Sequence, residues 1–389
     1  MKTSLLLFGF SLSLTLSPQM ISDVMGEEVN NCFKEEVAKI KDSLAMETSR
    51  LELIPNTGKW DSKVEVYSDL AYNDLLTRYS GWNGGDGCYT LLLPDGRILW
   101  SFQDSFFGQV KPDRARVDNA FVHNAGILQP DPKKTEFIQL NPGKEAKSKS
   151  WIEYPDNPAG DKDWYWSAAG LVHDGKYYKL LGHIQKTGPG AWDFKNMSTD
   201  LAIFSLPDFR LIQIVKDKTV GDVCYGSGIF DAPDGYTYLY GTTNANLTVA
   251  RAANHDISGK WEFYTRNGWA DQPDNYSIGQ NISPQPNVFQ DGCKFYLVSQ
   301  QVMGQDIYLY EAASPVGPWL NKRTIYRIPD KYDGSKIITY NACLHPVLSK
   351  GGELVISYNV NPVDFWDNFN APGSADMYRP YFIRVFNWK

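Results

Sequence analysis

Residues 81–107 read GWNGGDGCYTLLLPDGRILWSFQDSFF and contain the local pattern that the rest of the chain repeats. Two apolar runs, CYTLLL and RILWSFQD, flank Pro94-Asp95-Gly96. A Pro-Asp-Gly loop between apolar runs is typical of a β-hairpin with glycine in the left-handed position. The stretch is therefore predicted to form two antiparallel strands.

The predicted register of this hairpin places two carboxyl groups face to face. With the turn centred on Asp95, Thr90 lies opposite Trp100, and the same register puts Asp86 opposite Asp104 at the open end. Like charges directly opposite one another destabilise a strand pair, so such a pair suggests a raised pKa, a bound cation or a substrate. Either aspartate alone could instead cap a turn, and a one-residue slip would put the two on opposite faces.

The same hairpin pattern recurs along the chain. Each further copy has two apolar runs around a glycine-containing turn: residues 166–186, 225–243, 285–301 and 342–361. Self-similarity at a period of roughly 40 to 70 residues is typical of propeller blades, which share their apolar faces around an axis. We therefore predict an all-β fold, a five-bladed β-propeller over residues 61–389, in which the strand at 63–67 completes the last blade. Two packed sandwiches are the alternative.

The N-terminal residues indicate export. Lys2 and the apolar stretch 4–16 resemble a secretory signal peptide, and the stretch is too short to span a bilayer. We predict a signal peptide over residues 1–25 and a secreted or periplasmic protein, with outer-membrane association left open. Residues 26–60 are predicted to form a short N-terminal helical segment. Its apolar residues recur at helical spacing: Phe33, Val37, Ile40 and Leu44.

The composition favours a carbohydrate ligand over nucleic acid. Aromatic residues make up 14% of the 389 residues, and flat rings suit both β-strands and the apolar faces of sugars. The net charge is −7 and there is no long basic run, which argues against nucleic-acid binding. The predicted partner is an oligo- or polysaccharide, bound by a monomer without a membrane span.

The ends of the hairpin strands would meet at one mouth of a propeller channel, which is the expected place for a site. Cleavage of a glycosidic bond normally needs a proton donor with a raised pKa and a second carboxylate as base or nucleophile. We predict Asp86 and Asp104 as catalytic acids, and Asp222 as a further catalytic candidate that would donate the proton if one of the pair only tunes the other. The predicted sugar-binding residues are Asn124, Trp166, His183, Tyr225 and His345, although His345 could equally be a core histidine.

No metal site and no required cofactor are predicted. The five cysteines are widely spaced and form no C-x-x-C motif, so neither a zinc site nor a disulfide scaffold is indicated. A structural calcium ion is left open.

Several segments carry a resemblance to a known group of proteins. They are GGDG, FQDSFFG, FVHNAGI, YGSGIF, YTYLYGTT, LTVARAA, HPVLS and LVISYNVN. Together they resemble the secreted five-bladed propeller proteins of a domain family of unknown function from glycan-degrading bacteria. That group is similar to the endo-D-arabinanase family and, more distantly, to glycoside hydrolase family 43. The resemblance implies that Asp86 and Asp104 lie in an active site.

The predicted function is that of an exported glycoside hydrolase acting on a complex polysaccharide. The family-43 pattern has a glutamate as acid in the third blade, where this chain has Tyr225-Gly226-Ser227. A chain that lacks the donor would be a non-catalytic glycan-binding propeller, with the aspartates holding a cation. In a third interpretation, a polysaccharide lyase, Tyr225 with His183 or His345 would abstract a proton alpha to a uronate carboxyl group.

Overall fold

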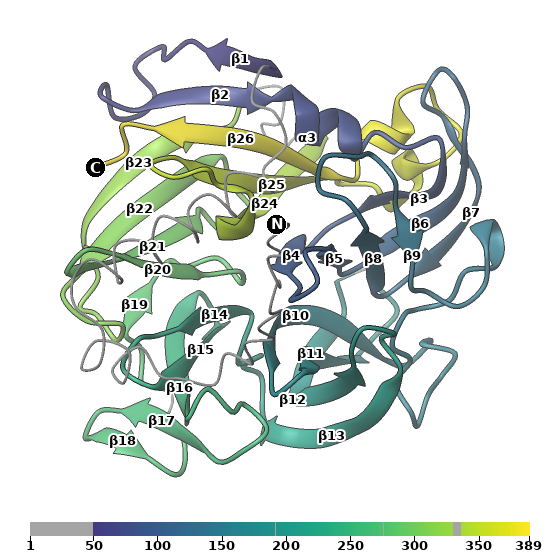
Figure 1. The fold of residues 1–389 in the computed structure, drawn as a ribbon. Helices are drawn as coiled ribbons and strands as arrows, with labels where there is room; N and C mark the ends of the chain where they lie inside the picture. The colour runs from purple at the N-terminus through teal and green to yellow at the C-terminus, as the bar shows by residue number, and fades with distance from the viewer. Residues whose placement is uncertain (1–49, 191, 275, 330–335) are drawn as a thin grey trace, which may run out of the picture. The chain divides into compact units, whose positions relative to one another are not determined.

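The computed structural model describes residues 50–190, 192–274, 276–329 and 336–389, all within the compact unit Leu44–Lys389. These residues form antiparallel β-sheets with few and short helices (Figure 1). The predicted signal peptide and the predicted helical repeat of residues 33–44 lie outside the described residues. No helix in the described ranges is long and apolar enough to cross a membrane.

The first hairpin region supplies two sheets, with the strand orders β3-β6-β7 and β4-β5-β8-β9. The strands are β3 (Ser80–Gly85), β4 (Tyr89–Leu92), β5 (Ile98–Phe102), β6 (Ser105–Val110), β7 (Arg116–Val122), β8 (Ala125–Gln129) and β9 (Ile138–Gln139). Thr90 pairs with Trp100, which confirms the predicted register. The predicted strand pair is nevertheless divided between two sheets.

The next three hairpins each belong to a sheet of their own, with the orders β10-β11-β12-β13, β14-β15-β16-β17-β18 with β19 on β16, and β20-β21-β22-β23. The strands are β10 (Asp163–His173), β11 (Lys176–Lys186), β12 (Phe194–Ser205), β13 (Leu211–Val220), β14 (Gly228–Asp231), β15 (Tyr236–Thr243), β16 (Asn246–Ala253), β17 (Trp261–Thr265), β18 (Gly268–Ala270), β19 (Gly279–Gln280), β20 (Asn287–Asp291), β21 (Lys294–Gln300), β22 (Asp306–Ala312) and β23 (Leu320–Arg327). The predicted turn at Asp174-Gly175 is present, and both residues have the positive φ that a two-residue hairpin turn requires.

The last sheet joins the two ends of the described chain in the order β1-β2-β26-β25-β24. Its strands are β1 (Leu51–Ile54), β2 (Glu65–Asp69), β24 (Ile337–Leu344), β25 (Leu354–Pro362) and β26 (Pro380–Phe386). Val66 pairs with Val385, which confirms that the early strand completes the last sheet. Residues 51–54 lie in the range predicted as helical, but they form a strand that covers the open edge of β2.

The helical elements are short. They are α3 (Leu70–Leu75) and the 3-10 turns η2 (Glu145–Lys147), η4 (Pro346–Leu348), η5 (Phe365–Asn368) and η6 (Ser374–Asp376). Asp69 begins α3, because its side chain accepts a hydrogen bond from the Tyr72 main-chain N–H at 3.1 Å.

The sheets stand around a common centre, with β4, β10, β14, β20 and β24 innermost (Figure 1). Contacts join β4 to β10, β10 to β14, β14 to β20, β21 to β24, and η4 to β4. This radial arrangement is that of a β-propeller. Hydrogen bonding alone divides the described strands into six sheets, so the count of five blades stays a prediction.

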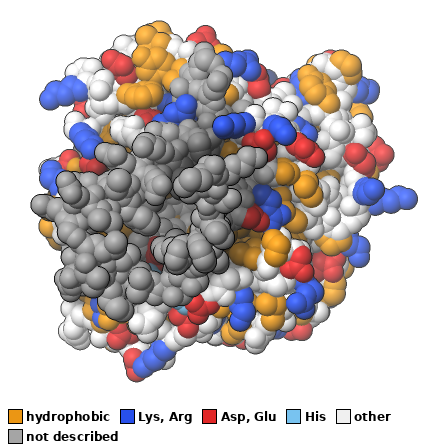
Figure 2. All heavy atoms as spheres, viewed as in Figure 1, with side chains coloured by type: hydrophobic (Ala, Val, Ile, Leu, Met, Phe, Trp, Pro, Cys, Tyr) orange, Lys and Arg blue, Asp and Glu red, His pale blue; other side chains and the backbone are white. Residues whose placement is uncertain are grey.

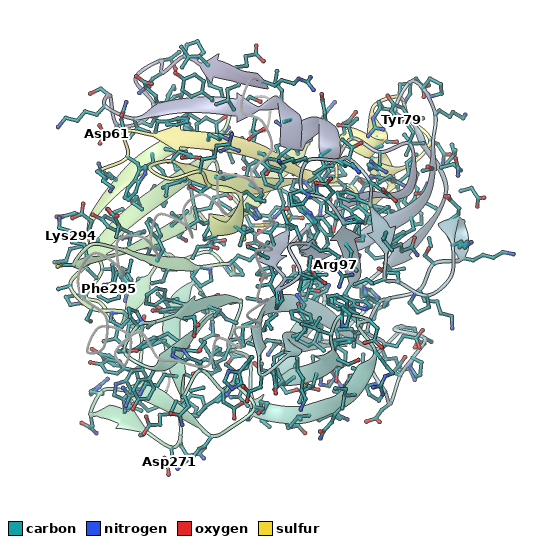
Figure 3. The ribbon with its side chains drawn as sticks, in the orientation of Figure 1. Asp61, Tyr79, Arg97, Asp271, Lys294 and Phe295 are labelled. Carbon is teal, nitrogen blue, oxygen red and sulfur yellow. The ribbon has the colours of Figure 1, made fainter. Side chains whose placement is uncertain are left out.

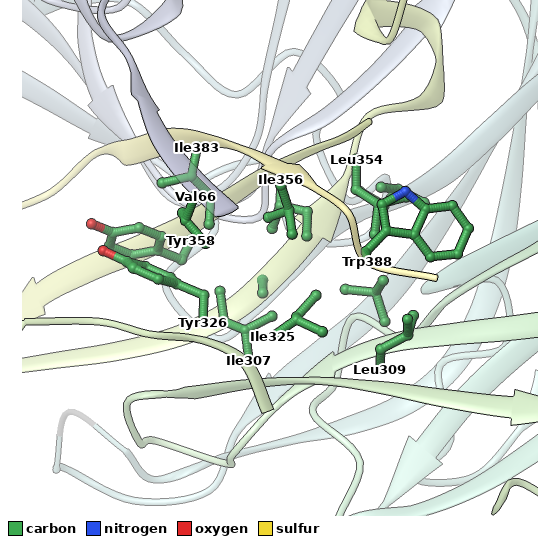
Figure 4. Packing of buried hydrophobic residues seen from close by; sticks show 14 of the residues in the cluster. Val66, Ile307, Leu309, Ile325, Tyr326, Leu354, Ile356, Tyr358, Ile383 and Trp388 are labelled. Atoms are coloured by element: carbon green, nitrogen blue, oxygen red, sulfur yellow. The ribbon is translucent and has the colours of Figure 1, made fainter. Parts of the chain in front are cut away.

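Apolar cores lie between neighbouring sheets. In the largest, Val66, Ile356 and Ile383 of the last sheet pack against Ile307 and Ile325 of its neighbour, and all five are buried (Figure 4). Full burial of one such side chain stabilises a fold by roughly 1.5–3 kcal/mol. The sheet that joins both ends of the described chain is therefore held to its neighbour by a continuous core.

Candidate active site

Asp86 and Asp104 lie where the first hairpin passes from the sheet of β3 and β6 to the sheet of β4 and β5. The Asp86 main-chain N–H donates to the Asp104 carbonyl at 3.1 Å, and the Gln103 N–H donates to the Asp86 carbonyl at 2.8 Å. Gly85 pairs with Ser105 and Tyr89 with Ser101, so the register is kept, but the regular strand pairing is interrupted by bends at Asp86-Gly87 and Gln103-Asp104. The acid pair therefore occupies the bend of the ribbon.

Glycine at position 87 permits this bend. Gly87 has φ +57°, and a Cβ atom added there would lie 2.5 Å from Cγ of Gln103. Both the backbone conformation and the lack of space disfavour any other residue. The GGDG segment is thus a local cause of the geometry around Asp86.

Both aspartates line one large cavity of about 1010 Å³, which we call the central cavity. Its acidic lining residues are Asp86, Asp104, Asp161, Asp193 and Asp222. Its basic lining residues are His123, Lys186 and Lys195. Its aromatic lining residues are Phe121, Trp164, Trp166, Trp192, Phe194, Tyr340, Phe365 and Tyr378.

Asp86 is buried in an environment that favours its protonated form. Burial, with a further contribution from the negative charge of Asp104, raises the pKa of Asp86 to about 7, and hydrogen bonding by Tyr340 and Tyr378 partly opposes this rise. The Tyr340 hydroxyl donates to Asp86 Oδ2 at 2.6 Å. Asp86 Oδ1 has no partner that meets hydrogen-bond geometry among the described residues. Asp86 can therefore carry a proton near neutral pH.

Asp104 is held by two side chains that contact the same carboxylate oxygen. Its Oδ1 atom accepts a hydrogen bond from Trp166 Nε1 at 2.9 Å and lies 2.9 Å from His123 Nδ1. His123 Nε2 lies 3.1 Å from the Gly160 carbonyl oxygen, which can only accept, so Nε2 carries a proton. The His123 ring also stacks on Trp164, with centroids 4.6 Å apart, which fixes its orientation.

Four of the predicted site residues meet in the central cavity: Asp86, Asp104, Trp166 and Asp222. Asp222 is exposed, and its carboxylate accepts a hydrogen bond from the Thr243 hydroxyl. Trp166 reaches the cavity from β10 and binds Asp104 directly. The paired aspartates therefore do not lie on opposite faces of the ribbon.

Asn124 and Tyr225, which were predicted to bind sugar, do not line the central cavity. The Asn124 amide donates to the Ile152 and Tyr165 carbonyls at 2.9 Å each, so its polar atoms are used to join chain segments. Tyr225 is buried in the core against Phe263. Their positions correct the prediction that they bind sugar in this cavity. Polar groups near strand ends can instead hydrogen-bond to the neighbouring backbone or pack between sheets.

His183 and His345 are also outside the central cavity. His183 Nε2 lies 2.8 Å from Asp163 Oδ1, and its ring stacks on Tyr154. His345 is fully buried between the Thr90 and Ser357 hydroxyls, and burial lowers its pKa to about 3. His345 is therefore a core histidine, which was the alternative interpretation. Neither His183 nor His345 is placed to bind a ligand in this cavity.

Three important residues were not predicted: His123, Tyr340 and Tyr378. His123 directly precedes Asn124, but its partner Asp104 is remote in sequence, so no local pattern marks it. Tyr340 lies in β24, which begins at Ile337, before the predicted start of the fifth hairpin at residue 342. Tyr378 lies in the segment before β26, where no periodic pattern exists.

The described residues contain no group of three or more His, Cys, Asp or Glu side chains that could hold a metal ion. The four described cysteines are free. Calcium also accepts carbonyl and amide oxygens, so a structural calcium ion stays an open prediction.

The chain is similar to a sequence family and to several proteins of known structure. The family model described as "Domain of unknown function (DUF5005)" matches residues 69–388. The crystal structure of a "putative hydrolase" from Bacteroides ovatus is similar at 34% sequence identity and a TM-score of 0.79, covering 88% of this chain and 97% of that chain. A GH43_1 enzyme from Xanthomonas citri complexed with xylotriose matches at 12% identity and a TM-score of 0.45, covering 80% of this chain and 87% of that chain. A search of curated proteins found no match.

Proposed function

The chain belongs to the family described as "Domain of unknown function (DUF5005)", and we propose that it is a glycoside hydrolase that cleaves oligo- or polysaccharides with Asp86 and Asp104. The observation that carries the proposal is the contrast between these neighbouring carboxyl groups. Burial favours a proton on Asp86, whereas Asp104 accepts a hydrogen bond from the Trp166 indole N–H and lies 2.9 Å from His123 Nδ1. Two carboxyl groups whose environments differ in this way are typical of an acid and its catalytic partner. The hydrolase description of the Bacteroides ovatus protein agrees with it.

In the proposed reaction Asp86 is the general acid and Asp104 the nucleophile. Asp86 gives its proton to the leaving oxygen as the Asp104 carboxylate bonds to the anomeric carbon. Water then attacks that carbon, gives a proton to Asp86 and releases Asp104. Facing residues of paired strands have Cβ atoms roughly 5 Å apart, which allows their carboxyl groups to reach the spacing of about 5–5.5 Å used by retaining enzymes.

An inverting reaction with Asp222 as the donor is the competing arrangement, since Asp222 lines the same cavity. Proton NMR of the first-formed sugar anomer separates the two. Retention supports the Asp86–Asp104 pair, and inversion supports Asp222.

The charge of the central cavity favours a neutral glycan. Acidic side chains outnumber basic ones in its lining, whereas the described surface in Figure 2 shows both signs interspersed. A uronate would need cationic partners for its carboxylate. The bases considered for a lyase, Tyr225, His183 and His345, all lie outside the cavity. An elimination carried by these three residues is therefore not supported.

We also propose that the fold has five blades and that the protein is exported. The sheets of β3-β6-β7 and β4-β5-β8-β9 are linked by the main-chain hydrogen bonds at Asp86, and counted as one blade they give a five-bladed propeller. Export to the periplasm or medium, as the N-terminal residues predict, would place the protein with polymeric glycans.

The test is a screen of plant, microbial and host polysaccharides in water enriched in heavy oxygen. The expected result is new reducing ends that carry the heavy isotope, with no unsaturated uronides. The double variant Asp86→Asn/Asp104→Asn is the control for contaminating glycosidases. The absence of cleavage across the panel, unsaturated products, or equal cleavage by the double variant would each contradict the proposal.

His123→Phe is expected to lower kcat by about tenfold to a hundredfold with little change in KM. Phenylalanine keeps a ring to stack on Trp164 but removes the hydrogen bond to Asp104, and a hydrogen bond to a charged group contributes roughly 1.5–3 kcal/mol. The measurement is steady-state kinetics on the glycan that the screen identifies.

His183→Phe is the matched control, because it removes a second His–Asp pair with a stacked ring, 2.8 Å apart, outside the cavity. Equal losses of kcat in the two variants would contradict the positioning role of His123.

A further inference from the structure

Trp192 is an exposed aromatic side chain at the edge of the central cavity. It lines the cavity although 58% of its surface is exposed. Val302, Met303 and Val363, from loops of other sheets, also line the cavity and are exposed. Exposed apolar side chains gathered at the rim of a polar site indicate a binding surface.

Ring contacts connect Trp192 with the proposed catalytic residues. Its ring lies 6.4 Å from that of Phe194, which in turn packs edge-on against Trp166 at 4.7 Å. Trp166 donates its indole N–H to Asp104. A row of aromatic side chains thus leads from the rim to the acid pair.

The backbone beside Trp192 is held in a defined shape. The Asp193 carboxylate accepts a hydrogen bond from the Gly190 N–H at 2.7 Å, and the Thr187 N–H donates to the Asp193 carbonyl at 2.8 Å. Cβ atoms at Gly188 and Gly190 would lie 2.5 and 2.8 Å from Asp193 Oδ2, so the loop closes tightly around this carboxylate. These contacts hold the main chain at Gly190 and Asp193, on either side of Trp192.

The volume of the central cavity exceeds the need of one sugar ring. At about 1010 Å³ it equals the upper end of the range of roughly 300–1,000 Å³ for sites that hold drug-sized ligands. A single sugar at Asp86 and Asp104 would leave the rim at Trp192 empty.

We infer that Trp192 is the stacking platform of an outer sugar subsite, so that the ligand is a neutral glycan chain of several units rather than a short glycoside. The inference rests on the proposed function, because it assigns another part of the same site. A sugar ring stacks its apolar C–H face on the indole while its neighbours extend along the aromatic row to the acid pair.

The test measures binding without cleavage. Isothermal titration calorimetry measures the affinity of the full chain carrying Asp86→Asn for oligosaccharides. The ligands are cello-, xylo-, arabino-, galacto- and mannohexaose and the corresponding disaccharides. Adding Trp192→Ala is expected to weaken binding of the hexasaccharide about tenfold and to leave the disaccharide unchanged. Trp366→Ala is the matched control, because Trp366 is 74% exposed but does not line the cavity.

Equal hexasaccharide affinity with and without Trp192 would overturn the inference, as would equal losses for both chain lengths or no binding of any hexasaccharide. Length-dependent binding that requires Trp192, in a protein whose wild type cleaves nothing in the panel, would uphold the subsite and reject the hydrolase.

Discussion

Asp104→Asn is expected to lower kcat by roughly a thousandfold or more while the protein stays folded. The amide cannot act as nucleophile or base, but its oxygen can still accept the hydrogen bond from Trp166. The measurement is initial velocity on the identified glycan, with melting temperature as the check on folding. Asp271→Asn is the control, since Asp271 is exposed, paired with Lys260, and lies at the edge of the molecule (Figure 3). A loss of less than tenfold would contradict the assignment.

Asp86→Asn separates the two catalytic roles. A general acid matters most for poor leaving groups, so aryl glycosides with acidic phenols are expected to retain much of their kcat/KM, which reports the first step, in Asp86→Asn but not in Asp104→Asn. Because Asp86 has a pKa of about 7, wild-type kcat/KM is expected to fall as the pH rises above that value. This fall disappears in Asp86→Asn. Equal losses on both substrate classes would exclude Asp86 as the acid.

The hairpins and the position of the acid pair could be predicted because both depend on neighbouring residues. Turn chemistry at Pro94–Gly96 fixes the register of β4 and β5, and the pairing continues to Asp86 and Asp104. The division of this ribbon between two sheets was not predicted, because it depends on strands such as β7 and β8 that pair with it from outside the hairpin.

The sugar-binding predictions were less successful for a physical reason. A polar residue near a strand end can face the cavity or satisfy a neighbouring strand, and the sequence pattern is the same in both cases. Trp166 faces the cavity, whereas the Asn124 amide joins other chain segments and the His345 ring lies between hydroxyls of two sheets. His123 and Tyr340 act on aspartates remote in sequence, so only the assembled sheets bring them together.

Asp86→Asn is also expected to stabilise the folded protein above about pH 7. Folding raises the pKa of Asp86 from 3.8 to about 7, because the buried carboxylate is poorly solvated and faces Asp104. The folded state therefore binds the proton more tightly than the unfolded state. The stability that this proton supports is complete below about pH 4 and is lost as the pH rises through about 7.

Asparagine stays neutral at every pH and keeps an oxygen for the Tyr340 hydroxyl. The difference in unfolding free energy between the variant and the wild type should therefore grow between about pH 4 and pH 7 and then level off, at no more than about 4 kcal/mol. Urea unfolding across this range measures it, with Asp271→Asn as the control. If the unfolding free energies of wild type and Asp86→Asn changed with pH in parallel, the charge on Asp86 would not lower the stability of the folded protein. A growing difference would show that the proposed active site reduces the stability of the fold that holds it, as expected where a buried acid is kept for chemistry.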